Sequence, residues 1–272
     1  MINDITVNSW EELQTELFRD SWNDKIQRHR SNYVYRGLWN SQFDLSTSLM
    51  RLGGPYSDLE AHLLRNFRKY AHSTASPGNS VWNWMAVAQH HGLPTRLLDW
   101  TYSPYVALHF ATAALHSELE SVIWAVNYVK AKEYLPPELK TALDLVGANV
   151  FTPEILEPVC ASLNELELLQ QKDYVMFLEP PSLDARIVHQ FALFAMMSSA
   201  TAQLDKWLEE HPELYFRIII PAHLRWEIRD KLDQANITER VLFPGLNGLS
   251  EWLHRHYSTR NPNASFDAGS LI

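Results

Sequence analysis

The stretch Ala88-Gln-His-His-Gly-Leu-Pro-Thr-Arg-Leu-Leu-Asp-Trp-Thr101 is a dense group of polar side chains within otherwise apolar sequence. A predicted helix over 80–91 ends at its His-Gly pair, and Gly-Leu-Pro breaks the chain. Residues 96–100 then predict a short strand. Ser103-Pro104 predicts an N-cap followed by proline in the first turn of a helix over 105–117. This part of the chain therefore predicts helix, strand and helix in succession.

Outside this stretch, the periodicity of apolar residues predicts further helices and strands. Ser9-Trp10-Glu11-Glu12 has the form of a capping box and begins a predicted helix over 9–28. No internal repeat or linker divides the chain, so we expect a single α+β domain. Further helices are expected over 57–73, 153–170, 202–210, 222–235 and 247–257, and strands over 32–37, 122–129, 174–178, 191–197 and 215–220.

Composition and charge restrict the class of protein. Of the 272 residues, 46% are hydrophobic and 20% charged, a balance that buries a core. The net charge of -9 argues against a broad basic face for duplex nucleic acid. Cys160 is the single cysteine, so we expect a small core residue in a helix rather than a disulfide or a zinc ligand. The acidic first 20 residues and the short apolar runs predict a cytoplasmic protein without a membrane role, and no residue set predicts a metal site.

The polar side chains of residues 88–101 need partners, because a buried group without one costs about 1 to 3 kcal/mol. One interpretation is structural. In it, Arg96 and Asp99 form an ion pair that braces a turn, and the histidines cap the preceding helix. The residues that can satisfy one another are Gln89, His90, Thr95, Arg96, Asp99 and Thr101.

A functional interpretation starts from Asn32-Tyr-Val-Tyr-Arg-Gly37, a predicted strand that ends in an arginine and a glycine. Alternation places Val34 and Arg36 on one face of the strand and both tyrosines on the other. Gly37 permits the close approach of a ligand or of a second backbone. A guanidinium at a strand end is a good receptor for phosphate. His189-Gln190 lies at the junction of a helix-like segment and the strand over 191–197, where sites are often built.

Together these motifs resemble the FRG domain, a family named for its Phe-Arg-Gly signature. The stretches that carry the resemblance are Tyr35-Arg36-Gly37, Leu45-Ser-Thr-Ser-Leu-Met-Arg51, residues 88–101, Ala107-Leu-His-Phe-Ala111, Arg186-Ile187, Gln190 and Leu242-Phe-Pro-Gly-Leu-Asn-Gly248. We assign residues 1–258 to this domain and expect a loose tail over 259–272. Residues 135–171 carry the least family signal and are interpreted as a helical insertion near the cleft.

The order of elements in this family is similar to that of ADP-ribosyltransferases, which have mixed or antiparallel sheets with surrounding helices. The resemblance implies NAD as cofactor, Arg36, Asp99 and Gln190 as catalytic residues, and a cofactor site formed by Arg36, Gly37, Gln89, His90, Thr95, Arg96, Trp100 and Thr101. Gln190 stands where such enzymes carry a glutamate. An amide stabilises an oxocarbenium-like state less than a carboxylate does, so Asp99 or Glu179 is the alternative carboxylate. Trp100, Tyr102 or Tyr105 would stack on nicotinamide.

The resemblance leaves three functions open. The first is an ADP-ribosyltransferase-like effector of toxin or antiviral-defence type, which uses NAD and modifies a protein or nucleic-acid acceptor. The second is a non-catalytic module that senses a nucleotide or a protein partner. In the third, residues 95–101 are purely architectural, and Asp99→Asn is expected to unfold the protein.

Overall fold

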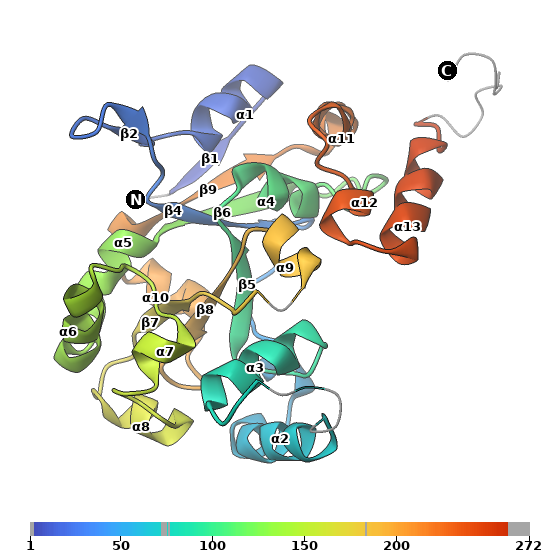
Figure 1. Ribbon diagram of the computed structural model, residues 1–272. Helices are drawn as coiled ribbons and strands as arrows, with labels where there is room; N and C mark the ends of the chain where they lie inside the picture. The colour runs from blue at the N-terminus through green and yellow to red at the C-terminus, as the bar shows by residue number, and fades with distance from the viewer. Residues whose placement is uncertain (1–2, 72–74, 76, 183, 261–272) are drawn as a thin grey trace.

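One mixed seven-stranded sheet forms the centre of the computed structural model, which describes residues 3–71, 75, 77–182 and 184–260 (Figure 1). The strand order is β1-β9-β6-β4-β5-β8-β7. Within the described residues, β1 pairs with β9 in parallel and the other neighbours are antiparallel. The strands are β1 (Asp4–Thr6), β4 (Tyr33–Leu38), β5 (Leu97–Thr101), β6 (Ser121–Asn127), β7 (Val175–Leu178), β8 (Ala192–Met197) and β9 (Tyr215–Ile220). The α+β prediction is confirmed.

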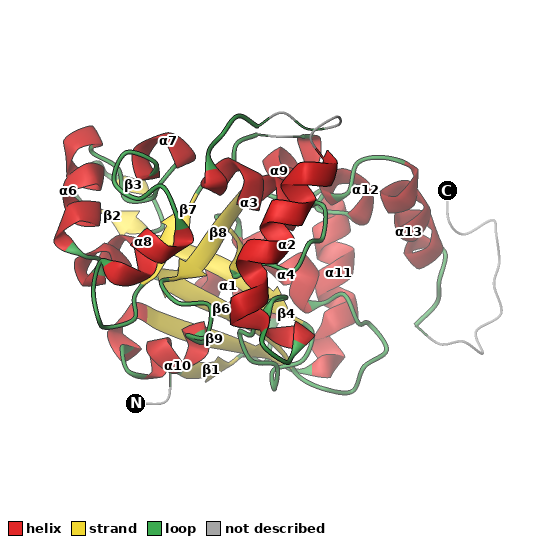
Figure 2. Ribbon diagram, turned by 90° about the horizontal axis from the view of Figure 1, so that it is seen from below, coloured by secondary structure: helices red, strands yellow, loops and turns green. Residues whose placement is uncertain are grey.

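Thirteen α-helices of the described residues surround the sheet. Figures 1 and 2 agree in placing α6, α7 and α8 together at one end of the molecule and α12 and α13 at the other. The helices are α1 (Trp10–Leu17), α2 (Tyr56–Ala71), α3 (Val81–His90), α4 (Pro104–Ala111), α5 (Tyr128–Ala131), α6 (Pro137–Val146), α7 (Pro153–Leu156), α8 (Leu163–Leu168), α9 (Ala185–His189), α10 (Leu204–Glu209), α11 (Arg225–Gln234), α12 (Glu239–Leu242) and α13 (Leu246–His256). Single 3-10 turns are η1 (Met50–Leu52), η2 (Lys132–Tyr134), η3 (Pro212–Leu214) and η4 (Ala222–Leu224).

The two faces of the sheet are covered differently, because side chains alternate along each strand. One face carries a continuous core that includes Val34, Leu98 and Leu193. The opposite face is divided into two cores. Over β4, β6 and β9, Tyr35 and its neighbours pack against α1, α4 and α11. Over β5, β7 and β8, Leu97 and its neighbours pack against α2, α3 and α6 to α8. The seam between these two cores lies where β4 meets β5.

The predicted helix over 9–28 is wrong beyond its second turn. Ser9 caps α1 as expected, since its side chain accepts from the backbone of Glu12, but α1 ends at Leu17. A two-stranded hairpin of β2 (Trp22–Asn23) and β3 (Arg28–His29) follows. The chain leaves helical geometry at the C-cap Phe18 and enters the left-handed region at Asp20, whose φ is +53°. Trp22, which lies within the predicted helix, belongs to β2 instead and is 49% exposed.

The predicted helix over 153–170 is two short helices, α7 and α8. Cys160 lies between them rather than in a helix, but it is fully buried, so its prediction as a core residue is confirmed. Its carbonyl accepts a hydrogen bond of 2.8 Å from the indole nitrogen of Trp82. Burial raises the pKa of the thiol to about 11, so the side chain stays protonated and unreactive near neutral pH.

The remaining predicted elements are close to those observed. The strand over 215–220 coincides with β9, and the helix expected over 105–117 is the shorter α4. β1, α5 and α12 were not predicted, whereas α6 lies within the segment that was interpreted as a helical insertion. β1 has three residues and joins the sheet only through distant β9, so local sequence gives little signal for it. Of the predicted tail, residues 261–272 lie outside the described residues.

Candidate functional site

The sheet opens between β4 and β5. Among the described residues these strands pair at a single position, Tyr35 opposite Thr101, whereas β4 forms six pairs with β6 and β5 forms five with β8. The side chain of Arg36 bridges the gap, because its Nη1 donates to the backbone carbonyl oxygen of Asp99 at 2.5 Å. A main-chain acceptor is thus satisfied by a guanidinium instead of a neighbouring strand.

A cavity of about 210 Å³ occupies this opening. Arg36, Asp99 and Gln190, the three residues predicted to be catalytic, all line it. Their side chains come from β4, β5 and the C-cap of α9, so three distant parts of the chain meet there. Of the predicted cofactor residues, Gly37, Trp100 and Thr101 also line the cavity. The remaining lining residues are Tyr35, Val106, Ala107, Phe110, Arg186 and Ala192.

Gly37 is required by a second backbone rather than by a ligand. A Cβ atom at this position would lie 1.8 Å from the carbonyl oxygen of Ala107 in α4. Real Cβ atoms do not approach a carbonyl oxygen so closely, and a helix backbone cannot yield easily. The glycine therefore allows α4 to lie directly on β4, which fixes the wall of the cavity.

The cavity lining has an excess of positive charge. Burial lowers the pKa of Arg36, while the charge of Asp99 opposes that shift, and the Nε of Arg36 is buried without a hydrogen-bond partner. The guanidinium of Arg186 lies 5.3 Å from the centre of the Phe243 ring, and within the described residues it has no hydrogen bond or ion pair. Two guanidiniums thus face one carboxylate in the described lining, in a chain whose net charge is -9. Such a lining favours an anionic ligand.

A chain of hydrogen bonds holds the carboxylate of Asp99. Nε2 of Gln89 donates to its two oxygens at 3.1 and 3.2 Å. The hydroxyl of Thr95 donates in turn to Oε1 of Gln89 at 2.6 Å. Gln89 and Thr95 do not line the cavity, so they position Asp99 instead of contacting a ligand.

The predicted ion pair of Arg96 with Asp99 is wrong. Arg96 is 4% exposed, and its Nε donates to both carboxylate oxygens of Glu60 at 2.8 and 2.9 Å. It also donates to Glu167 and to the carbonyl of Ser198. Residues three apart on an extended chain point to opposite faces, so Arg96 and Asp99 diverge. Arg96 does not line the cavity and belongs to the buried structure beside it.

His90, Tyr102 and Tyr105 do not line the cavity, whereas Trp100 lines it but is almost fully buried. Nε2 of His90 is 2.7 Å from Oδ2 of Asp184, a contact that ties the end of α3 to the start of α9. Trp100 is 3% exposed and packs within the continuous core, so its ring offers no open stacking face. Tyr102 donates to Glu179 at 2.8 Å, and neither residue lines the cavity. Asp99 is therefore the carboxylate that the described residues provide there.

Gln190 is fixed by both its backbone and its side chain. Its carbonyl accepts from the hydroxyl of Thr101 at 2.7 Å, and its Nε2 donates to the carbonyl of Leu242 at 3.0 Å. The side-chain nitrogen of Gln190 is thus already used in a hydrogen bond within the protein. The amide oxygen is the part of the side chain that remains for a ligand.

The sequence interpretation missed Arg186 as a lining residue. Arg186 comes four residues before Gln190 on α9, so the helical spacing around the predicted junction was the signal that could have found it. No described residue of 135–171 lines the cavity, and α6 to α8 pack in the core under β5, β7 and β8. Glu167 is linked to the region only through its bond to Arg96.

The described residues also bear on two other kinds of site. Among them, no group of three or more histidine, cysteine, aspartate or glutamate side chains is arranged to hold a metal ion. None of their helices combines the length and the apolar character needed to cross a membrane.

The fold and the site define an α+β protein whose mixed sheet opens a cationic pocket between two strands. Residues 31–119 match the family model of the FRG domain, so the chain carries an FRG domain, as its motifs predicted. The match runs from β4 through α4 and includes Arg36 and Asp99, whereas Arg186 and Gln190 lie beyond it. No curated protein and no solved structure matches the chain.

Proposed function

We propose that the pocket between β4 and β5 binds the ribose-phosphate part of a nucleotide, with NAD as the ligand, and that the protein acts on it as ADP-ribosyltransferases do. The observation that carries this proposal is the convergence of Arg36, Asp99 and Gln190 on one cavity. Arg36 lines this cavity, and a phosphate oxygen is an acceptor well suited to a guanidinium. The uncommitted guanidinium of Arg186 adds a second cation at the same cavity.

The size of the cavity limits what it encloses. Sites that enclose a whole small molecule have volumes of roughly 300 to 1,000 Å³, and this cavity has about 210 Å³. A dinucleotide therefore places one portion inside, and the rest lies over the rim. The nicotinamide riboside end with its adjoining phosphate is the portion that the arginines and Gln190 are suited to hold.

The proposed roles follow from the chemistry of each group. Arg36 and Arg186 neutralise the phosphate, and the amide oxygen of Gln190 accepts a hydrogen bond from a ribose hydroxyl. Cleavage of the bond between nicotinamide and ribose develops positive charge on the sugar. The carboxylate of Asp99, held by Gln89, would stabilise that charge. Nicotinamide leaves, and the ADP-ribosyl group passes to a protein or nucleic-acid acceptor.

A second candidate function is a sensor that binds the nucleotide without turning it over. It is favoured by Gln190, which has an amide where transferases have a carboxylate, and whose nitrogen is tied to Leu242. It is also favoured by Asp99, whose two oxygens both accept hydrogen bonds from Gln89 and are thereby weakened as charge stabilisers. In either form, the protein would serve as a cytoplasmic component of a toxin or antiviral-defence system, with a protein partner in the sensor case.

Calorimetric titration with NAD and with ADP-ribose tests the proposal. We expect saturable binding that Arg36→Ala abolishes and that Arg28→Ala, a change at an exposed arginine of β3, leaves intact. Incubation with labelled NAD and a lysate separates the two functions. A transferase labels an acceptor or releases nicotinamide and loses that activity in Asp99→Asn, whereas a sensor binds without product. Absence of binding to both nucleotides would exclude both functions.

A further inference from the structure

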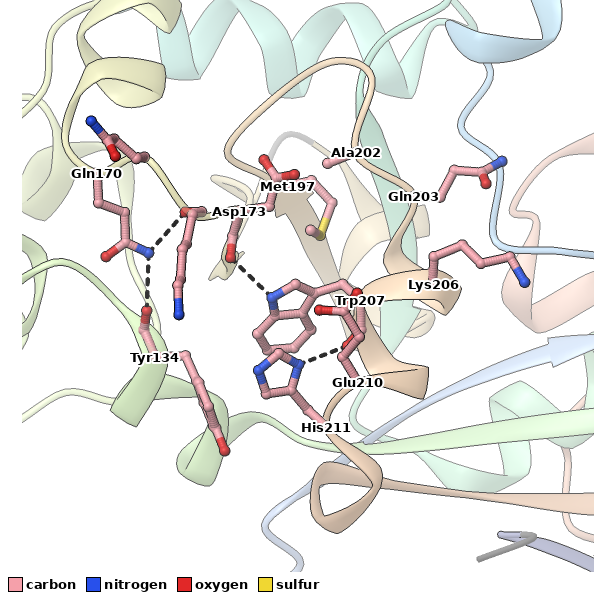
Figure 3. A pocket seen from close by; sticks show the side chains of 12 residues that line it. Tyr134, Gln170, Asp173, Met197, Ala202, Gln203, Lys206, Trp207, Glu210 and His211 are labelled. Carbon is pink, nitrogen blue, oxygen red and sulfur yellow. Dashed lines mark hydrogen bonds between the residues drawn. The ribbon is translucent and has the colours of Figure 1, made fainter.

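A second and larger cavity of about 890 Å³ lies at the other end of β8. β8 begins at Ala192, which lines the pocket described above, and ends at Met197, which lines the second cavity. Six residues of strand separate them by roughly 16 Å. Figure 3 shows the second cavity between the segment of Gln170 and Asp173 on one side and the helix of Lys206 and Trp207 on the other. The two cavities are therefore separate sites.

The floor of this cavity is a rigid aromatic cluster. Trp207 is 7% exposed, and its indole nitrogen donates to the carbonyl of Asp173 at 3.0 Å. The ring of His211 stacks on the indole with centroids 4.1 Å apart and planes at 26°. Tyr134 meets both rings edge-on, at 5.6 and 4.5 Å. Because Tyr134 and His211 remain partly exposed, they offer an aromatic surface to the C–H groups of a ligand.

The wall of the cavity mixes donors and acceptors and has no net formal charge in its described residues. Lys172 and Lys206 balance Asp173 and Glu210. Nε2 of Gln170 is committed to the carbonyls of Tyr134 and Lys172, which leaves its oxygen as an acceptor. Nδ1 of His211 faces the carbonyl of Trp207 at 2.7 Å and must be the donor there, so Nε2 of the neutral ring is also an acceptor. The side chains of Gln171 and Gln203 supply both kinds of group.

We propose that this cavity binds a neutral oligosaccharide. Each sugar hydroxyl both donates and accepts, as the wall does, and the C–H face of a pyranose packs on aromatic rings. The volume lies within the range of sites that enclose a ligand of several rings. The two carboxylates would repel an anionic ligand, and the two lysines would repel a cationic one, so the wall favours a neutral ligand. An extended peptide would need an open strand edge, and of the described lining only Met197 belongs to a strand.

The test uses the full chain with three neutral probes, maltotriose, cellotriose and N-acetylchitotriose, in saturation-transfer NMR and calorimetry. We expect saturable binding of at least one probe. We expect the double variant Gln171→Ala/Glu210→Ala to weaken it about tenfold or more, because both side chains are exposed wall groups. Glu251→Ala, at an exposed position of α13, is the matched control and should leave affinity unchanged.

Arg36→Ala should also leave oligosaccharide binding intact, because Arg36 does not line the second cavity. The oligosaccharide proposal can therefore hold even if the nucleotide proposal fails. AMP, spermidine and penta-alanine serve as anionic, cationic and peptide comparators. The proposal is overturned if none of the three saccharides binds at millimolar concentration. It is equally overturned if a comparator binds instead and loses its affinity in the double variant.

Discussion

The guanidinium of Arg36 donates to the main-chain carbonyl of Asp99 and leaves the carboxylate of that residue to Gln89. Two strands that share one pairing position are thus held together by a side chain from one of them. The same contact keeps Arg36 at the opening, with its Nε unpaired. Arg36 therefore has a structural role, and the phosphate contact that we propose would be a second role that substitutions can separate from the first.

Arg36→Lys tests this double task. Lysine keeps the positive charge but lacks the planar guanidinium, whose several N–H groups can donate to a carbonyl and to a phosphate at the same time. We expect the affinity for NAD to fall about tenfold or more, while stability falls by about 1 kcal/mol, the typical contribution of one hydrogen bond. Calorimetry and urea unfolding measure the two effects. Unchanged NAD affinity in a folded Arg36→Lys protein would count against phosphate binding by this residue.

Asp99→Asn and Arg96→Met should differ sharply in stability. Asp99 is exposed, so asparagine is expected to cost less than about 1 kcal/mol, contrary to the architectural interpretation of this stretch. Methionine at position 96 leaves the carboxylate of Glu60 buried without its partner, which typically costs about 3 to 5 kcal/mol. Urea unfolding of both variants checks the difference. Glu60→Gln added to Arg96→Met should recover part of the loss, and equal losses in the two single variants would contradict the assignment.

Gly37→Ala is expected to destabilise the protein by about 3 kcal/mol or to prevent folding, because the new methyl group meets the backbone of α4. Gly92→Ala is the matched control. Gly92 has open space around it but a φ of +81°, so alanine there should cost only about 1 kcal/mol of backbone strain. Thermal unfolding measures both variants. A Gly37→Ala protein as stable as Gly92→Ala would show that α4 can move away from β4.

His109 should make the protein sensitive to mild acid. Burial, followed by the charge of Arg229, lowers the pKa of this histidine to about 3. Below about pH 6.5, the ordinary pKa of about 6.5 means that this histidine is protonated in the unfolded chain, whereas it stays neutral in the native protein. The free energy of unfolding should therefore fall by about 1.4 kcal/mol for each pH unit as the pH is lowered from about 6.5 to about 3.

Urea unfolding at neutral pH and at about pH 5 measures this slope. His109→Gln should flatten it, since glutamine does not titrate. His254→Gln is the control, because His254 is exposed on α13. A slope that survives in His109→Gln would assign the acid sensitivity to other groups.

Glu239 should affect the stability of the protein in a lower pH range than His109 does. Burial alone would raise its pKa, but hydrogen bonds from Arg255 and the charge of Arg229 bring it down to about 2. A depressed carboxyl pKa stabilises the native state above about pH 4.5, and that contribution disappears as pH falls toward 2. Glu239→Gln should thus cost about 3 kcal/mol at neutral pH and very little near pH 2. Unfolding curves of both proteins across this range measure the difference, and a constant difference would contradict the pKa assignment.

The sequence found the helix-strand-helix order around residues 88–101 because capping residues, glycine and proline act locally. It failed at residues 18–28 because an apolar spacing over two turns does not show that the next residues leave helical geometry. It also failed to pair Arg96, since Glu60 and Glu167 are 36 and 71 residues away in the chain. Arg186 was present in the motifs, and its spacing of one helical turn from Gln190 was the local sign that the interpretation did not use.

Local sequence was enough to establish the α+β class, the FRG signature and six of the residues that line the pocket. Each of these depends on residue types and on spacing along a short stretch of chain. Three features became apparent only from the three-dimensional fold: β4 and β5 diverge, Gly37 makes room for α4, and Arg36 and Arg186 share a cavity with Asp99. Those features arise from the packing of distant segments against each other, and a partner's distance in space has no counterpart in its spacing along the chain.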